Sequence, residues 1–447
     1  MGGGNALANY STSPQAAITG ARLVARQAIL LAQHRNANPR SLSGSNRPPS
    51  TEYLLKALLI SPEAPYPAIG GGALRTASML EFLARRYELD VIVFGQPEHS
   101  DPARDFPQGL VRRVLTIPLR LHYRNIAAKL WRNAGRLIRD VPPLVDRFQG
   151  YETEVLKAME GQQYEVAVFE HLWCAPLLPV VQPHAKRTCL NLHNIESNLF
   201  QTYAKSDPWP VSMAHRRWSN TCRKLEAQLL PRFDSLLTCS ESDAEQIRQY
   251  SANVHVFQNS IPLTPLPIVA KKYDLVFSGN LEYPPNKTAV AWFHREVWPL
   301  LVAARPDITW QIVGLHPDAV RSIVAADHRI TLTGPVERAV PAIAAARVAI
   351  VPLLSGSGTR IKILEAWAAG LPVVSTSLGA QGLTYSPGRE LFLEDTPIKF
   401  ATAISSLLDN SALSNQVGFA GRSLYEREYT WNAAWSQLDG YNLFLPT

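Results

Sequence analysis

The chain has 447 residues, more than one ordinary hydrophobic core organises, so two domains are expected. Hydrophobic residues make up 46% and charged residues 18%, which is typical of a globular protein, and no apolar run is long enough to span a bilayer. The four cysteines lack the spacing of a disulfide framework or a zinc site, which favours buried free thiols in the reducing cytoplasm.

The formal net charge of +7 is unevenly distributed. Residues 1–51 contain five arginines and no acid, and Arg112–Arg139 contains eight cations and no acid, so the remainder carries −6. A mildly acidic body with two basic segments is not typical of a nucleic-acid-binding protein, so no nucleic-acid partner is expected.

The first segment, residues 1–52, is rich in Gly, Ala, Asn, Ser and Pro, and we expect it to be a disordered extension. The Arg-rich composition of residues 1–51, which contain no acid, fits two interpretations, a targeting segment or a misassigned translation start.

From residue 53 to 262, short β-rich runs alternate with amphipathic stretches. Such alternation predicts parallel strands joined by helices, which is a Rossmann-like, doubly wound α/β domain. Its predicted strands are Lys56–Ile60, Asp90–Gly95, Glu165–Glu170, Arg187–His193 and Ser235–Ser240. Its predicted helices include Leu74–Tyr87 and Ser212–Leu230.

Three glycines follow the first predicted strand. Gly70, Gly71 and Gly72 precede a predicted helix that carries Arg75. Residues without a Cβ atom let a phosphate or sugar approach the backbone closely. The spacing is not that of a dinucleotide fingerprint, and a merely tight turn is the alternative.

Two histidines lie at predicted strand ends, where ligands of doubly wound sheets bind. His171 follows the strand that ends at Glu170, and His193 ends the next strand. A single histidine is more often a hydrogen-bonded structural residue than a catalyst. Glu196 is near enough in sequence to orient His193.

A basic amphipathic helix is predicted over Arg124–Arg139. Its cations recur at three- and four-residue steps on one face and include Lys129, Arg132 and Arg136, while apolar residues occupy another face. Such a helix can lie on an anionic membrane surface. The alternative is a helix packed on its own sheet with a solvated basic face.

A Pro-rich stretch near residues 259–268 is interpreted as a linker, after which the alternation restarts. A second Rossmann-like domain is therefore predicted over residues 268–430, and residues 431–447 are expected to hold a helix that crosses back to the first domain. Two such domains leave a cleft between them. The predicted strands of the second domain are Tyr273–Gly279, Thr309–Gly314, Arg329–Gly334, Val348–Leu353 and Pro372–Ser377.

The segment 352–383 carries the most chemistry. A buried strand ends in a Ser/Gly loop, and a helix is predicted to start near Gly358, Thr359 and Arg360. Free backbone N–H groups at that helix start, with Arg360 and Lys362 in the first turn, form a site suited to a diphosphate. Glu365 could reach a ribose through its hydroxyls. A generic βα unit with solvated charges is the alternative.

This segment resembles the donor-binding signature of retaining glycosyltransferases of family 4, which have the GT-B fold. That family's motif has two glutamates separated by seven residues; Glu365 matches the second, and Ser357 stands in place of the first. The stretch from Ser278 to Lys287 resembles the family's first loop in the same domain, with Asn280 in place of an arginine that grips the diphosphate and Lys287 near the position of a lysine. The first glycine loop and the His-Asn pair at His193 resemble family elements too.

The resemblance implies two Rossmann-like domains facing each other across a cleft, an acceptor domain first and a donor domain second. The residues implied in catalysis are His193, Arg360 and Lys362. The residues implied in donor binding are Gly71, Gly72, Asn280, Lys287, Gly358, Thr359, Arg360, Lys362 and Glu365. The residues expected on the acceptor or membrane side are Arg75, His171, Lys129, Arg132 and Arg136.

The implied activity is transfer of a sugar, with retention, from a nucleotide-sugar donor to a carbohydrate or lipid-linked acceptor in polysaccharide or glycolipid assembly. The chain contains no Asp-x-Asp pair, so a metal-independent enzyme without a cofactor is expected. Its expected location is the cytoplasm, with peripheral membrane binding left open. The replaced motif residues keep two alternatives open, a non-catalytic nucleotide-sugar-binding protein and a GT-B epimerase.

Overall fold

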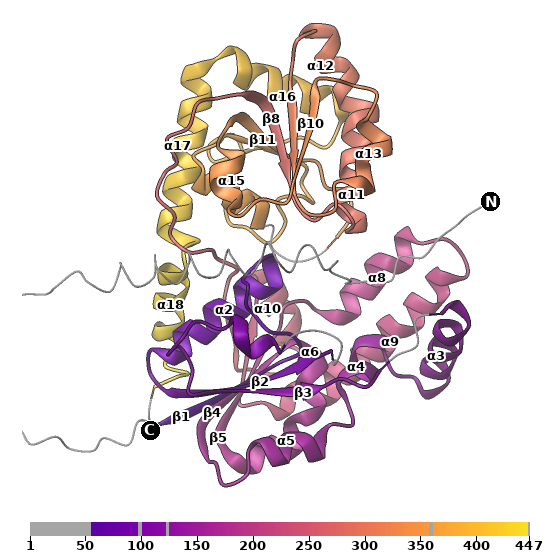
Figure 1. Cartoon of the computed structure of the whole chain (residues 1–447), viewed down its shortest axis with the longest axis vertical. Helices are drawn as coiled ribbons and strands as arrows, with labels where there is room; N and C mark the ends of the chain where they lie inside the picture. The colour runs from indigo at the N-terminus through magenta and orange to yellow at the C-terminus, as the bar shows by residue number, and fades with distance from the viewer. Residues whose placement is uncertain (1–54, 97–100, 122–124, 357–360, 446–447) are drawn as a thin grey trace, which may run out of the picture.

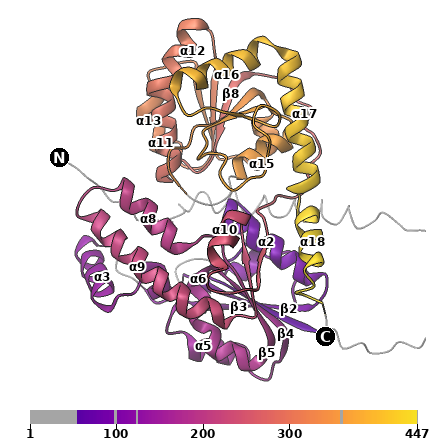
Figure 2. The same ribbon diagram turned by 180° about the vertical axis from the view of Figure 1, so that it is seen from behind.

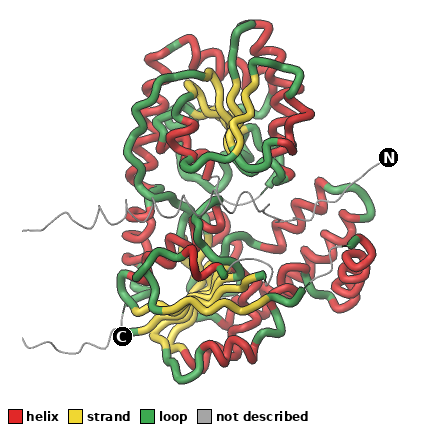
Figure 3. Tube along the Cα trace, in the orientation of Figure 1, coloured by secondary structure: helices red, strands yellow, loops and turns green. Residues whose placement is uncertain are grey.

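The computed structural model describes residues 55–96, 101–121, 125–356 and 361–445. They form two α/β domains, one above the other in Figure 1, and each is built around a parallel sheet. The tube in Figure 3 shows the two sheets as separate groups of strands flanked by helices. The predicted α/β fold class is confirmed. The expected extension, residues 1–52, lies outside the described residues.

The first domain has a seven-stranded sheet of order β3-β2-β1-β4-β5-β6-β7, with every neighbouring pair parallel. Its strands are β1 Lys56–Ser61, β2 Glu88–Gly95, β3 Arg113–Pro118, β4 Tyr164–Glu170, β5 Ala185–Asn191, β6 Ser235–Thr238 and β7 Val254–Val256. Its helices are α2 Gly71–Ala84, α3 Ile126–Arg139, α4 Pro143–Phe148, α5 Glu152–Ala158, α6 His171–Cys174, α7 Leu178–Val181, α8 Glu196–Ser206, α9 Val211–Leu229 and α10 Glu241–Ile247.

Both faces of this sheet are buried because alternate strand residues point to opposite sides. Leu58 and Ile60 of β1 pack with α4 to α7 and α10, whereas Ala57 and Leu59 pack with α2 and with the last helix of the chain, α18 (Trp431–Gly440). A continuous apolar strand such as β1 is what a two-sided core requires.

The second domain has a six-stranded sheet of order β10-β9-β8-β11-β12-β13, again parallel. Its strands are β8 Tyr273–Ser278, β9 Trp310–Val313, β10 Ile330–Gly334, β11 Ala346–Val351, β12 Val373–Ser375 and β13 Phe392–Leu393. Its helices are α11 Pro284–Trp292, α12 Trp298–Ala304, α13 Asp318–Val324, α14 Ala339–Ile343, α15 Ile361–Ala368, α16 Pro397–Asp409 and α17 Ser411–Glu428.

The strands that the sequence pattern did not predict, β3, β7 and β13, all lie at sheet edges. β3 has only one fully buried residue, and β7 and β13 are three and two residues long. An edge strand contacts one neighbour and buries less surface, so it carries a weaker apolar signal than a central strand.

Two chain segments cross between the domains side by side. The linker residue Ile261 pairs with Thr430, and backbone hydrogen bonds join Ile261 N to Tyr429 O at 3.1 Å and Trp431 N to Ile261 O at 3.2 Å. Beyond this crossing, α18 continues from α17 and reaches the first domain, as seen from both sides in Figures 1 and 2. There the indole N–H of Trp435 donates to the carbonyl of Ser78 at 3.0 Å.

The expected orientation of the basic helix was wrong. In α3, Arg136 is only 8% exposed, and its Nε donates to Asp146 of α4 at 2.8 Å. Arg139 pairs with the other oxygen of Asp146 at 2.8 Å, and Arg132 and Lys129 are half-buried. The basic face therefore turns towards the protein, because Asp146 lies just beyond the acid-free segment and draws the arginines inward. Within the described residues, no helix is both long enough and apolar enough to cross a membrane.

Candidate active site

The order of strands reverses once in each sheet, between β1 and β4 in the first and between β8 and β11 in the second. At such a reversal the loops after neighbouring strands leave in opposite directions, which opens a ligand site at the carboxyl strand ends. The glycine loop follows β1 and His171 follows β4, while Gly279 follows β8 and the segment leading to α15 follows β11. Sequence motifs from both domains thus lie at the two reversal points.

The two halves approach each other at the first turns of α2 and α15. A methyl group added to Gly71 would lie 3.2 Å from Cγ1 of Ile361, the first residue of α15. One added to Gly72 would lie 3.9 Å from Nδ1 of His193. The expected glycine loop is thus partly helical, since α2 begins at Gly71. We call the region formed by Gly71, His193, Ser278, Lys362 and Glu365 the interdomain site.

Lys362 lies in the first turn of α15 and points towards the end of β8. Its Nζ donates to Oδ1 of Asn286 at 2.9 Å and lies 5.3 Å from the centre of the Phe277 ring. A Cβ on Gly279 would come within 2.8 Å of the Asn286 amide nitrogen, so the missing side chain leaves room for the amide group that holds this ammonium. The predicted residues Ser357, Gly358, Thr359 and Arg360 lie outside the described residues.

Glu365 lies on the same face of α15, three residues after Lys362. Burial raises the pKa of the carboxyl to about 7, although the Lys362 charge and a hydrogen bond from Ser278 act in the opposite direction. The side chain keeps part of its surface exposed. A carboxyl group held in this way can exchange hydrogen bonds with hydroxyl groups of a ligand.

Asn280 and Lys287 were the two residues predicted in the loop after β8, and within the described part of the chain the structure shows neither of them in contact with Lys362. Asn280 uses its Oδ1 to accept the N–H of Glu282 at 3.0 Å, which shapes its own turn. Lys287 is exposed on α11. The residue that reaches Lys362 is Asn286, which also donates to the carbonyl of Asn280 at 2.8 Å. A proline pair before Asn286 is the local signal, because it starts α11 there.

His193 is buried, and its partner is Glu170, not Glu196 as expected. The ring Nε2 lies 2.5 Å from Oε2 of Glu170, a carboxyl group with no exposed surface at the end of β4. Glu196 instead accepts the indole N–H of Trp173 at 3.0 Å. Strand pairing places Glu170 beside Asn191, so it is β5, not sequence proximity, that brings His193 to this carboxyl group.

Burial and the charge of Arg75 hold the pKa of His193 well below its usual value, so the ring is neutral. Glu170 accepts hydrogen bonds from Asn191 at 3.1 Å and Thr76 at 3.2 Å. Burial raises the pKa of Glu170, whereas the hydrogen bond from Asn191 acts in the opposite direction. An ionised Glu170 accepts from Nε2 of His193, which leaves Nδ1 as an acceptor beside Gly72.

His171 belongs to a stack of three rings. Its ring centre is 3.6 Å from that of His193 and 4.2 Å from that of Trp173. The backbone has a φ of 64°, and the ring Nδ1 is buried without a hydrogen-bond partner in the described part of the chain. Burial and the nearby His193 lower the pKa of His171 well below its usual value. Its predicted place on the acceptor side stays a prediction.

Arg75 does not face an acceptor or a membrane, and that prediction was wrong. The side chain is 2% exposed and donates to Asn191 through Nε at 3.1 Å, to Asn259 at 3.0 Å and to the carbonyl of Phe257. The inward face of α2 carries it into the first domain's core, where it joins the helix to the ends of β5 and the linker.

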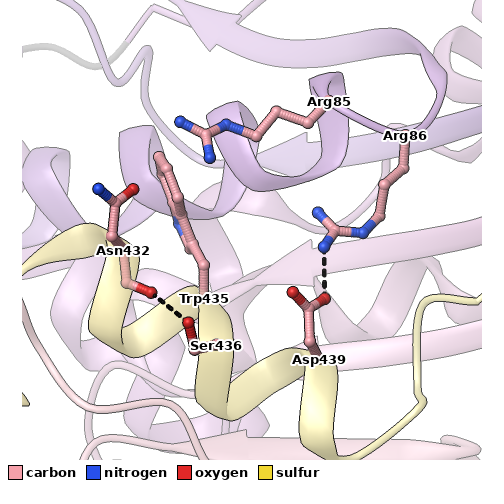
Figure 4. A pocket seen from close by; sticks show the side chains of 6 residues that line it. All are labelled: Arg85, Arg86, Asn432, Trp435, Ser436 and Asp439. Atoms are coloured by element: carbon pink, nitrogen blue, oxygen red, sulfur yellow. Dashed lines mark hydrogen bonds and ion pairs between the residues drawn. The ribbon is translucent and has the colours of Figure 1, made fainter.

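A surface hollow elsewhere has a different role (Figure 4). It measures about 450 Å³ and lies at the opposite end of α2 from Gly71, where α18 packs. The Arg85 guanidinium lies 3.8 Å from the Trp435 ring centre, and Arg86 forms an ion pair with Asp439. These contacts attach α18 to α2, so the chemistry is placed at the interdomain site instead.

Comparison with known proteins addresses the fold and the class of protein. Residues 272–410 match the family model described as glycosyl transferases group 1. A sucrose-phosphate synthase from Thermosynechococcus elongatus has a similar structure, with a TM-score of 0.64 and 17% identity, covering 87% of this chain and 98% of that one. The chain is a GT-B glycosyltransferase.

Other similar proteins extend the comparison. Anabaena HepE in complex with UDP and glucose has a TM-score of 0.60 and 14% identity, covering 87% of this chain and 99% of that one. An uncharacterised 44.6 kDa protein in the cps region of Klebsiella pneumoniae is 22% identical over 86% of this chain and 99% of its own length. A GDP-mannose-dependent monoacylated alpha-(1-6)-phosphatidylinositol monomannoside mannosyltransferase of Corynebacterium glutamicum is 29% identical over 30% of this chain and 38% of its own length.

Proposed function

We propose that this glycosyltransferase belongs to family 4 and moves a sugar from a nucleoside diphosphate sugar to an acceptor hydroxyl, with retention of the anomeric configuration. The observation that carries the proposal is the pair Lys362 and Glu365 on one face of α15, beside the end of β8. A cation and a carboxyl group one turn apart suit the diphosphate and the ribose of such a donor. Both lie within the segment that matches the group 1 model.

In this proposal the donor's diphosphate lies between the first turn of α15 and the Lys362 ammonium. Asn286 fixes that ammonium through its Oδ1 and so keeps the charge in one place before the donor arrives. Arg360 remains a predicted second cation from the sequence. Preorganised positive groups around a leaving diphosphate contribute on the order of several kcal/mol to the rate.

Glu365 holds the nucleoside in the proposal by accepting hydrogen bonds from the ribose hydroxyls. Ionised carboxylate is the better acceptor, and a ligand that supplies donors shifts the carboxyl towards that form. In the proposal the sugar lies on the opposite side, against His193 and the glycines 71 and 72. The neutral Nδ1 of His193 can accept a hydrogen bond from a sugar hydroxyl, and the glycines leave space above this ring.

Retention follows in the proposal if the acceptor hydroxyl attacks the face from which the diphosphate leaves. The bond from the anomeric carbon to the diphosphate oxygen breaks, a bond to the acceptor oxygen forms, and the acceptor's proton passes to the departing diphosphate. We propose that no metal takes part, because the leaving charge has protein partners.

For substrates we propose a glycan or lipid-linked acceptor in the assembly of a polysaccharide or glycolipid. The mannosyltransferase relative, named for a phosphatidylinositol mannoside, and HepE, solved with UDP and glucose, support a nucleotide-sugar donor and an acceptor of this class. We propose a cytoplasmic location, for which the four buried free cysteines are support.

The experiment is a binding and hydrolysis screen of the purified chain against UDP-, GDP-, ADP- and dTDP-sugars in EDTA. It is run beside Glu365→Ala and a matched control, Glu296→Ala, whose exposed carboxylate pairs with Arg295 in the same domain. We expect one donor to bind and hydrolyse slowly with wild type and the control, and to be lost with Glu365→Ala.

Three results would count against the proposal. Binding of no nucleotide sugar, or loss of all activity in EDTA that a metal restores, would contradict the donor site or its metal independence. Tight binding without turnover of any acceptor would favour a binding protein. The observation behind this alternative is Asn280, which stands in place of a diphosphate-binding arginine and uses its Oδ1 within its own turn. Conversion of donor to an epimer without acceptor would favour an epimerase.

A further inference from the structure

Helix α3 turns its apolar side to solvent. Trp131 and Ile138 are both 82% exposed, and Leu130 is 66% exposed. Ala127 and Ala134 are exposed on the same side. At 100° per residue these five positions fall within about a third of the helix circumference, so they form one continuous stripe. Both views place the helix at the outer edge of the first domain, beside α9 (Figures 1 and 2).

The orientation of α3 is fixed by its other side. Arg136 and Arg139 pair with Asp146, and Leu137 packs on a small cluster of Phe200, Trp218 and Cys222. The helix ends at Asp140 in a left-handed conformation, and the hydroxyl of Thr221 donates to the Asp140 carboxylate at 2.6 Å. The apolar stripe is therefore held outward by interactions that exclude rolling the helix over. A surface of this kind marks an interaction site more often than chance.

The charge around the stripe indicates which kind of partner it can bind. Residues 119–149 contain seven Lys or Arg and two Asp, which gives this short segment +5 of the chain's total of +7. Arg139 keeps 54% of its side chain exposed at the end of the helix. Two copies of the chain meeting at α3 would bring two such positive segments together, which disfavours a symmetric dimer. An anionic surface is the complementary partner.

We propose that the outward face of α3, formed by Ala127, Leu130, Trp131, Ala134 and Ile138, docks on an anionic lipid bilayer. A lone helix with a tryptophan and two aliphatic side chains outward can sink to headgroup depth, where indole rings are favoured. Arg139, which keeps 54% of its side chain exposed at the end of the helix, can then meet lipid phosphates. In this proposal the apolar side of α3 contacts the membrane. A helix that bound through its arginines alone would present its opposite side.

The proposal rests on the proposed function in one respect only: a bilayer at the first domain would present a lipid-linked acceptor. The test is co-sedimentation of the full chain with vesicles of phosphatidylcholine, with and without phosphatidylglycerol. The variants are Trp131→Ser with Ile138→Ser, and Trp131→Ser alone. The matched control is Ile398→Ser with Phe419→Ser, which removes residues 71% and 74% exposed from the second domain.

We expect wild type and the control to bind vesicles that contain phosphatidylglycerol, and the double variant to bind at least about tenfold more weakly. Trp131→Ser alone is expected to bind at an intermediate level. Donor hydrolysis without vesicles is expected to match wild type in all variants, so a loss of binding is not a loss of folding.

Equal vesicle binding by wild type and the double variant would overturn the proposal, as would wild-type binding that does not depend on phosphatidylglycerol. A wild-type dimer in analytical ultracentrifugation that the double variant converts to a monomer would assign the stripe to a second copy. Vesicle binding by a chain that binds no nucleotide sugar would leave the docking face in place and remove the proposed function.

Discussion

Two helices of this protein, α15 and α3, carry cations that the sequence marks as functional, and the structure treats them in opposite ways. Lys362 of α15 lies at the boundary of the two domains, where its ammonium donates to the side-chain amide of Asn286 from α11. Arg136 of α3 lies against Asp146 within its own domain. The difference shows that a cation pattern on a helix is informative only when the topology decides what the helix faces. α15 follows β11 at a strand-order reversal, whereas α3 follows an edge strand.

The largest effect is expected from removing the α15 cation. Lys362→Ala should lower kcat/KM for transfer by about 100- to 1,000-fold, because the leaving diphosphate loses a preorganised charge. Lys287→Ala is the matched control, since this lysine is exposed on α11, and its kcat/KM should change by no more than about twofold. Steady-state kinetics on both variants checks the contrast. A larger loss in Lys287→Ala than in Lys362→Ala would make Lys287, and not Lys362, the main diphosphate lysine.

The next effect tests the structural role of the α3 cations. Asp146→Ala should lower the free energy of unfolding by about 3 kcal/mol, because it leaves the nearly buried Arg136 without its carboxylate. Asp318→Ala, which removes an exposed carboxylate paired with Arg321, should change it by less than about 1 kcal/mol. Denaturant titration measures both. If Asp146→Ala is as stable as the control, the inward orientation of α3 does not depend on this pair.

A third variant concerns the first-domain side of the site. Glu170→Gln should lower kcat by about tenfold, because an amide can donate to Nε2 of His193 and move the ring proton to Nδ1. Glu170 acts through His193, so KM for the donor should change less than kcat. Glu160→Gln, an exposed glutamate of the same domain, is the control. An unchanged kcat and pH profile in Glu170→Gln would make the Glu170–His193 pair purely structural.

A pH dependence of similar size is expected at Glu365. Glu365 has a raised pKa of about 7, so its carboxyl is protonated in the free enzyme below that pH and ionised above it. Donor binding to the ionised form should therefore strengthen by roughly tenfold between about pH 6 and pH 8. The folded state holds this proton more tightly than the unfolded chain, so the same group costs stability as pH rises to 7. Titration calorimetry with the donor on wild type and Glu365→Gln separates the effect on donor binding from the effect on stability, because the donor affinity of the variant should not change with pH.

Much of the fold could be predicted because a buried strand is recognisable from its own short run of apolar residues. β1, β4 and β8 each have a buried apolar centre, and the predicted ranges differ from these strands by one residue at an end. The edge strands β3 and β7 could not be predicted, since half-buried strands resemble loops in composition.

The site divides in the same way. Glycines after β1 and the residues of α15 are recognisable because backbone approach and helix starts have local sequence requirements. The partner of His193 could not be found locally. Glu170 and His193 are 23 residues apart and meet only because β4 and β5 are neighbours. Asn286 was missed for a similar reason, since its contact with Lys362 spans 76 residues.

The sequence by itself determined the class of elements, the central strands and the residue types that a nucleotide-sugar site needs, because these depend on short-range patterns of burial and backbone freedom. Only the tertiary structure decided which way a side chain faces. In the structure Arg75 is buried against Asn191, His193 pairs with Glu170, and the apolar side of α3 faces outward. An amphipathic helix has two faces, and the free energy of packing against distant partners selects between them.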